Sequence, residues 1–500
     1  MQKFLSSKNV LILIIVVGLL SKLWALAITP EAAYNDSLYH LSIVKEILDQ
    51  KTLSLPEIDV PPPLYYAFFA SALILSQLSL TLFTSKMVPL VLSLVQLSLA
   101  FVVFRKLFPQ HYLAALAFFV SVPWLTRFGA VNYTEAISVV FVFSSMFLIM
   151  KLQEKKQTFF SAIPLAVSIS ALSLSKLNAT LLVPVFFLAS IYVLWKQHTS
   201  LKTVAGFIVI TVFLSGFWFG LNILKFGTLD QHNFQLASNE LTLGIDTAFP
   251  LSHLISFPHL YYLYFWDFPN LSAFSAQSFV SGIPFELAAV VFALMVLPLG
   301  ITLLNGAKQL IQKPTLLSFI VLLPIALEFI PIIQRAAYFR MIIPVVPLIA
   351  VVFAFGFAAL SNKFFKSLVI LSLLLFSFYS LAYTGTSALF FKDVFEKHLP
   401  LYNAISETPQ NSLVLVYSNN TRAVSFFSSR NPFGFNDNDA RFESNNASEF
   451  LSKVKQFNIT HIAQTCYKSP LNKKFLNELE QQGLVKEIFS DSCAKLYEVK

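Results

Sequence analysis

Long apolar stretches, separated by short polar segments, fill about the first 390 residues of the chain. Eleven of them approach the roughly 20 residues that an α-helix needs to cross a bilayer. They lie at residues 9–28, 86–104, 112–128, 135–150, 158–175, 178–195, 203–223, 282–304, 315–333, 340–360 and 367–385. The pattern predicts a polytopic α-helical membrane protein with about eleven transmembrane helices.

The composition supports this interpretation. Of the 500 residues, 56% are hydrophobic and only 12% are charged, and a soluble domain of this length could not bury so much apolar surface. A bilayer accepts it as long as the backbone stays helical. The first apolar stretch is too long for the core of a signal peptide and no clean small-residue cleavage site follows it, so we interpret it as an uncleaved first span.

A further apolar stretch, residues 63–83, decides the topology. It follows the prolines at 61 and 62, begins with Pro63 and contains Gln77. If it lies along the membrane surface or re-enters, the loops on the side of the N-terminus are the ones rich in lysine and arginine, as the positive-inside rule requires; if it spans, this bias inverts. The basic residues of the inner loops are then Arg105, Lys106, Lys151, Lys155, Lys156, Lys196, Lys202, Lys308, Lys313, Lys363 and Lys366. We therefore expect a cytoplasmic N-terminus and an extracytoplasmic C-terminus in the cell membrane.

Three outer segments are long in this topology: residues 29–85, residues 224–281 and the tail. The inner loops are short, so we expect the chemistry on the outer side. We divide the chain into a transmembrane catalytic domain, residues 1–390, and a small extracytoplasmic α/β domain, residues 391–500, which we interpret as an accessory or acceptor-binding module.

The tail alternates predicted strands and helices, which is typical of a compact α/β domain. The expected strands lie at 412–417 and 459–463, the expected helices at 446–455 and 471–481, and a terminal hairpin at 485–489 and 494–499. Ser448 is the candidate cap of the first helix. The only two cysteines, Cys466 and Cys493, lie in this tail; an exterior location permits a disulfide, and two free buried thiols fit the sequence equally well.

The first outer segment contains the first candidate for chemistry, Asp36. It precedes an amphipathic helix expected over residues 37–50, which includes His40 and is suited to the membrane surface. A carboxylate at this position caps the helix, acts as an acid or base, or does both. The proline-rich segment that follows carries Tyr65 and Tyr66, residue types that are also common at membrane interfaces.

The second outer loop contains Arg127 and ends at Glu135, which opens a span and is also explained by the helix dipole. Cations at outer helix ends, Lys86, Arg335 and Arg340, suit the binding of a phosphate group; snorkelling of long basic side chains is the ordinary alternative. The net charge of +9 follows from topology and lipid head groups, so it does not indicate a nucleic-acid partner.

The order of these motifs resembles that of the GT-C superfamily of membrane glycosyltransferases. Within it, the chain looks most like the branch that contains the protein O-mannosyltransferases and the lipid A aminoarabinose transferases. The resemblance covers about residues 1–390. It rests on Asp36 with the helix after it, on Pro62, Pro63, Leu64, Tyr65 and Tyr66, on Arg127 and Glu135, on Asn222 with Phe226 and Gly227, and on Arg340 with Pro344 and Pro347.

The resemblance implies a reaction. The donor is a polyprenyl- or dolichyl-phosphate sugar, the acceptor is a protein or a glycolipid, and membrane lipids surround both. Asp36 is implied as the general base and Glu135 as the residue that orients the sugar or the acceptor, with inversion at the anomeric carbon. The implied phosphate- and substrate-binding residues are Arg340, Arg335, Lys86, Tyr65, Tyr66, Arg127 and His40.

No nucleotide cofactor is expected from this resemblance. Many members carry an Asp-Glu pair in the first outer loop, where this chain has Asn35 and Asp36, so the use of a divalent cation stays open. Two other classes of function remain alternatives. A multi-span transporter would show inverted repeats and ionisable groups near the midplane of its spans, and a non-enzymatic envelope scaffold would tolerate changes at Asp36 and Glu135.

Overall fold

The computed structural model describes most of the chain. The described residues are 7–29, 35–51, 63–80, 82–122, 125–126, 134–154, 158–176, 178–226, 285–334, 339–417, 421–435, 441–442, 444–465, 473–491 and 493–500. They divide into two compact units, one comprising Met1–Ala27 and Glu46–Ser387, the other Ile28–Lys45 and Ala388–Lys500.

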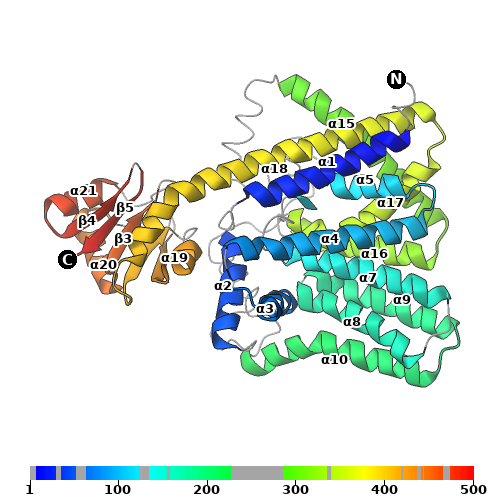
Figure 1. Cartoon of the computed structure of the whole chain (residues 1–500), viewed down its shortest axis with the longest axis horizontal. Helices are drawn as coiled ribbons and strands as arrows, with labels where there is room; N and C mark the ends of the chain where they lie inside the picture. The colour runs from blue at the N-terminus through cyan, green and yellow to red at the C-terminus, as the bar shows by residue number, and fades with distance from the viewer. Residues whose placement is uncertain are drawn as a thin grey trace. The chain divides into compact units, whose positions relative to one another are not determined.

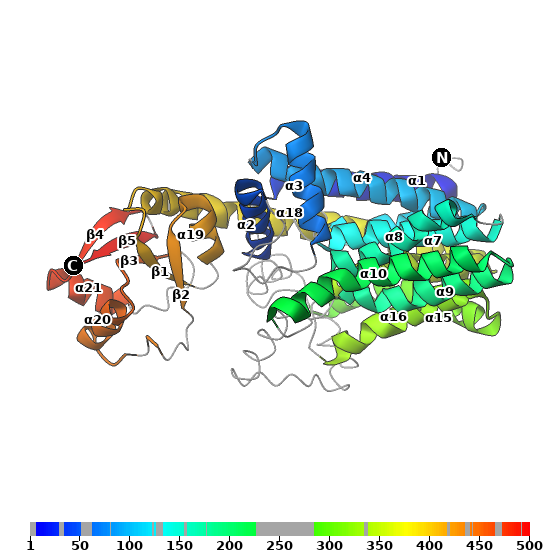
Figure 2. The same ribbon diagram turned by 90° about the horizontal axis from the view of Figure 1, so that it is seen from below.

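The first unit is a bundle of helices (Figures 1 and 2). Its helices are α1 (Ser7–Ile28), α3 (Leu64–Ser76), α4 (Leu82–Leu107), α5 (Tyr112–Ser121), α7 (Glu135–Glu154), α8 (Phe159–Ser175), α9 (Val183–Lys196), α10 (Leu201–Phe226), α15 (Phe285–Gln312), α16 (Leu316–Gln334) and α17 (Val346–Ala359), with the 3-10 turns η2 (Asn178–Leu182) and η4 (Phe339–Val345). Helices α2 (Asn35–Gln50) and α18 (Lys363–Ser406) run from one unit into the other.

Each of the eleven predicted spans overlaps a helix, which confirms the polytopic α-helical class. Among the described residues, seven helical segments are long and apolar enough to cross a membrane. They are Lys8–Ile28, Thr84–Leu107, Glu135–Glu154, Ala179–Lys196, Leu201–Leu221, Ile342–Ala359 and Lys363–Leu381. Helix α5 is shorter than the span predicted over 112–128, because it ends at Ser121.

The ambiguous stretch at 63–83 forms helix α3, which has only 13 residues. At 1.5 Å per residue it is about 20 Å long, short of the roughly 30 Å hydrocarbon core. The helix ends at Gln77, which adopts a left-handed conformation with φ 56° and donates its backbone N–H to the carbonyl of Ile74. Its length agrees with a helix that does not cross the membrane.

Small residues let the helices of the first unit approach closely, as is usual where both neighbours are apolar. Helices α7 and α8 exchange hydroxyl hydrogen bonds, Ser138 with Ser175 at 2.8 Å and Ser145 with Ser168 at 3.0 Å. Helices α15 and α17 touch backbone to backbone. A Cβ built on Gly356 would lie 1.8 Å from the carbonyl oxygen of Thr302.

We expect Gly356→Ala to destabilise the bundle by about 1–3 kcal/mol, because the new methyl group would have to push α15 and α17 apart. The matched control is Gly300→Ala in α15, where a Cβ would meet nothing within 4 Å. Thermal unfolding of the two variants in detergent checks this. Equal midpoints would contradict the close approach of the two helices.

The second unit contains a five-stranded mixed sheet in the order β2-β1-β3-β5-β4. Its strands are β1 (Leu413–Tyr417), β2 (Asn431–Phe435), β3 (His461–Gln464), β4 (Val485–Ser490) and β5 (Lys495–Val499), and its helices, besides parts of α2 and α18, are α19 (Thr421–Ser428), α20 (Ala447–Gln456) and α21 (Lys473–Gln481). Strand β1 pairs in parallel with β2 and β3, and β5 pairs antiparallel with β3 and β4. One apolar cluster gathers residues of α20 and α21, and a second those of α18 and α19.

The predicted elements of the tail are present, and the terminal hairpin is confirmed as the β4–β5 pair. The predicted cap was wrong: the cap of α20 is Asn446, whose side chain accepts a hydrogen bond from the backbone N–H of Glu449, whereas Ser448 is already the second residue of the helix. Cys493 is disulfide-bonded, and Cys466 lies outside the described residues.

Candidate functional site

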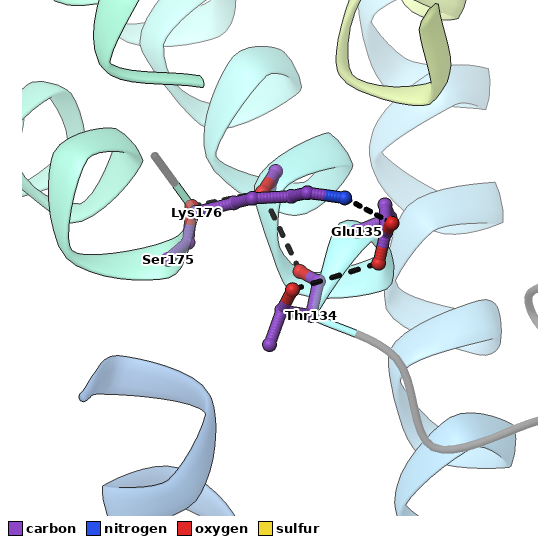
Figure 3. A network of polar contacts seen from close by, with 5 residues as sticks. Thr134, Glu135, Ser175 and Lys176 are labelled. Carbon is purple, nitrogen blue, oxygen red and sulfur yellow. Dashed lines mark hydrogen bonds and ion pairs between the residues drawn. The ribbon is translucent and has the colours of Figure 1, made fainter. Parts of the chain in front are cut away.

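The start of α7 carries an ion pair whose carboxylate is buried and whose lysine is half-buried. Glu135 is the first residue of α7 and is only 1% exposed, and its Oε1 pairs with Nζ of Lys176 (Figure 3). Lys176 caps the C-terminal end of α8. The two helices run antiparallel, as the Ser138–Ser175 and Ser145–Ser168 contacts require, so the start of α7 meets the end of α8.

Hydroxyl groups surround this ion pair (Figure 3). Thr134 Oγ1 donates to Oε2 of Glu135 at 3.5 Å, and Ser138 donates to the backbone carbonyl of Thr134 at 3.4 Å while contacting Ser175. Both carboxylate oxygens of Glu135 therefore have partners, and the helix N-terminus adds a favourable field. The arrangement holds the carboxylate in one orientation.

Tyr65 of α3 belongs to the same neighbourhood. It is fully buried, with its ring edge-on to Tyr66 and Phe69. Burial raises the pKa of the Tyr65 phenol, and the negative charge of Glu135 raises it further. The phenol thus stays protonated at neutral pH and remains a hydrogen-bond donor.

Two short turns complete this end of the bundle. Turn η4, which contains Arg340, packs against α7 and α16, and turn η2 packs against α8 and α16. Helix α16 contributes Glu328, a fully buried carboxylate. Buried ionisable residues of this kind in a membrane helix mark functional positions by default.

The predicted site residues lie in different helices and in both units, and not all of their side chains are described. Asp36 is the second residue of α2, and its backbone is described while its side chain is not. His40 is buried in the same helix, and it belongs with Asp36 to the second unit, whereas Glu135 belongs to the first. Lys86 is half-buried in the first turns of α4.

The remaining predicted cations are not all described. Arg127 and Arg335 lie outside the described residues, and for Arg340 only the backbone is described. The predicted roles of these three residues stay predictions. No group of three or more His, Cys, Asp or Glu side chains that would suit a metal occurs among the described residues.

Among the described residues, sequence reasoning missed two buried charged residues, Glu328 and Lys22, and the half-buried Lys176. The signal was present in each case, because each is a charge in or beside an otherwise apolar run. Position along a helix does not reveal whether such a side chain turns toward lipid, toward water or toward the bundle, so the sequence alone did not single them out.

The chain has the fold of the GT-C membrane glycosyltransferases. It superposes on ArnT from Cupriavidus metallidurans bound to undecaprenyl phosphate with a TM-score of 0.57, at 10% identity, over 97% of both chains. It superposes on the Archaeoglobus fulgidus oligosaccharyltransferase with a TM-score of 0.55, at 11% identity, over 92% of this chain and 69% of the other. The mycobacterial arabinofuranosyltransferase AftD gives 0.54 at 10% identity, over 97% of this chain and 40% of that one. No protein-family model and no curated protein sequence matches the chain.

Proposed function

We propose that the chain is an integral membrane glycosyltransferase that takes a sugar from a polyprenyl- or dolichyl-phosphate donor and transfers it to an acceptor outside the cell membrane. The observation that carries this proposal is the correspondence of fold over 97% of both chains with ArnT, a protein whose structure contains undecaprenyl phosphate. The motifs that resemble those of the superfamily support it independently, because they belong to the amino-acid sequence and not to the fold.

In the proposed reaction the acceptor hydroxyl or amine attacks the anomeric carbon, and the lipid phosphate leaves from the opposite face. Asp36 removes the acceptor proton as general base. The anomeric carbon is therefore inverted. Cations among Arg340, Arg335 and Lys86 stabilise the negative charge that develops on the leaving phosphate.

Glu135 orients the sugar or the acceptor in this scheme. Its suitability rests on the ion pair with Lys176 and the contact with Thr134, which hold the carboxylate in one orientation before any substrate arrives. A preorganised carboxylate binds sugar hydroxyl groups without first having to reorganise. Tyr65, protonated and buried beside this charge, is a second candidate for contact with the sugar.

We also propose the topology of the chain: a cytoplasmic N-terminus, and a second unit outside the plasma membrane that holds the protein or glycolipid acceptor. The distribution of lysine and arginine supports this orientation. It puts the start of α7, and so Glu135, toward the outer side, where lipid-linked donors present their sugars in this scheme.

The test is donor selectivity in proteoliposomes that contain the purified full-length chain. We expect transfer of labelled sugar to a membrane-extract acceptor from polyprenyl-phosphate sugars, and none from nucleotide sugars. Release of free polyprenyl phosphate in equal amount distinguishes transfer from transport, since a transporter would move the intact lipid-linked sugar. Transfer from a nucleotide sugar alone, or movement of intact donor without release, would overturn the proposal.

A further inference from the structure

Lys22 is a charged residue buried within α1. It is 9% exposed, and it shares a face of the helix with Ala25 and Leu26, which pack against Leu90 of α4. One turn earlier, a Cβ on Gly18 would meet Val120 of α5 at 2.7 Å. Lys22 therefore lies on the side of α1 that packs against the bundle, instead of on a side that would face lipid.

The only polar partner of this ammonium group among the described residues is a neutral one. Nζ of Lys22 lies 3.4 Å from Oε1 of Gln96 in α4, and Nε2 of Gln96 donates at 2.6 Å to the carbonyl oxygen of Ala136. Ala136 follows Glu135 in α7. Two hydrogen bonds thus connect Lys22 to the residue next to the proposed site.

This arrangement leaves the charge of Lys22 poorly balanced. An ammonium group has three donors, and a single amide oxygen at 3.4 Å is longer than an ordinary N–H···O bond. Burying a charge without an opposite charge is costly, and proteins retain such a charge mainly where it has a function. A carboxylate already neutralises Lys176, whereas no described carboxylate pairs with Lys22.

The position of Lys22 along the helix suits a ligand at the membrane interface. Helix α1 ends at Ile28, six residues further on, a rise of about 9 Å. An anionic head group drawn slightly into the bundle would reach this level while its hydrocarbon chain stays in the bilayer. Gln96 joins Lys22 to the first turn of α7, so Lys22 lies close to the start of that helix.

We propose that Lys22 binds the phosphate group of the ligand that occupies this end of the bundle, donating to a phosphate oxygen with the two protons that Gln96 does not accept. The inference rests on the proposed function, which it deepens by adding a buried cation to those chosen from the sequence. A polyprenyl phosphate and a free phosphate ion share the chemistry that Lys22 would recognise, so the experiment compares them.

The experiment measures thermal unfolding of the full-length chain in detergent with undecaprenyl phosphate, with undecaprenol and with inorganic phosphate. A ligand that binds only the folded state raises the midpoint in proportion to its affinity. We expect the phosphate-bearing lipid to stabilise the wild type more than the alcohol does. In Lys22→Met this difference is lost, with an affinity for undecaprenyl phosphate at least about tenfold lower, whereas Lys22→Arg retains it.

The matched control is Lys8→Met, an exposed lysine of the same helix, which should behave as the wild type. Without ligand, Lys22→Met should unfold at or above the wild-type temperature, because it removes a poorly balanced buried charge. A purely structural lysine would give the opposite pattern, a lower midpoint without ligand and an unchanged response to undecaprenyl phosphate, and that result would overturn the proposal.

The comparison between ligands assigns the source of the phosphate. Inorganic phosphate could stabilise the wild type as much as the lipid does and lose this effect in Lys22→Met. That result would support the phosphate site and assign it to a free phosphate ion. Binding and transfer are separate readouts. Binding that depends on Lys22, without any sugar transfer, would contradict the proposed function but support the phosphate site. Sugar transfer by a Lys22→Met variant whose affinity for undecaprenyl phosphate is unchanged would contradict the phosphate site alone.

Discussion

Asp36→Asn is expected to abolish sugar transfer while the protein still folds and inserts. Asparagine keeps the size of the side chain and can still form hydrogen bonds in the first turn of α2, but it cannot accept the proton of the acceptor. Loss of a general base costs about 10²–10⁴-fold in rate. The measurement is the initial rate of transfer from a polyprenyl-phosphate sugar by equal amounts of purified wild type and variant.

The control for this prediction lies on the same helix. Asp49 is exposed near the end of α2, so Asp49→Asn makes the same chemical change outside the proposed site and should leave the rate within about twofold of the wild type. Substantial activity of Asp36→Asn would remove Asp36 from the role of base. An equal loss of transfer rate in both variants would show that α2 tolerates no change of charge. It would also contradict the role of Asp36 as general base.

The ion pair between the buried Glu135 and the half-buried Lys176 gives the second large effect. Lys176→Met leaves the buried carboxylate of Glu135 without its counter-ion. We expect the free energy of unfolding to fall by about 3 kcal/mol or more, because an uncompensated buried charge destabilises the folded state. Glu135→Gln should cost less, since Lys176 keeps a side-chain exposure of 19%. In the double variant the two losses should largely cancel.

Activity separates a structural pair from a functional one. If Glu135 orients the substrate, the double variant regains stability and stays inactive. If the pair only stabilises the bundle, the double variant regains both. The matched control is the Lys106–Glu154 pair between α4 and α7, which is 2.7 Å long and has side chains 29% and 56% exposed; removing either partner there should cost under about 1 kcal/mol.

The membrane-embedded class and most elements of the tail were predictable because both follow from local patterns, whereas strand β2 and helix α19 were not predicted. Runs of apolar residues near 20 in length define helices without reference to the rest of the fold, and the short alternating runs after residue 412 became the strands of a sheet. Helix ends were less predictable. Asn446 caps α20 in place of Ser448 because the cap depends on where the first turn begins, which adjacent polar residues leave undecided.

The candidate site was only partly predictable. Glu135 was identified from its place at the start of a span, but its partner Lys176 lies 41 residues further on and is brought close only by the antiparallel packing of α7 and α8. Lys22 is separated from Gln96 by 74 residues. Such contacts depend on which faces of two helices pack together. A helix that is apolar on all sides has no hydropathy pattern that indicates its packing face.

The measurement that tests the central claim most directly is transfer by the purified chain in lipid, with a radiolabelled polyprenyl-phosphate sugar as donor and membrane extract as acceptor, run beside Asp36→Asn. We predict that label appears in the acceptor with the wild type alone, together with an equal amount of free polyprenyl phosphate. Equal transfer by the wild type and Asp36→Asn, or transport of the intact donor with neither transfer nor release of phosphate, would contradict the account.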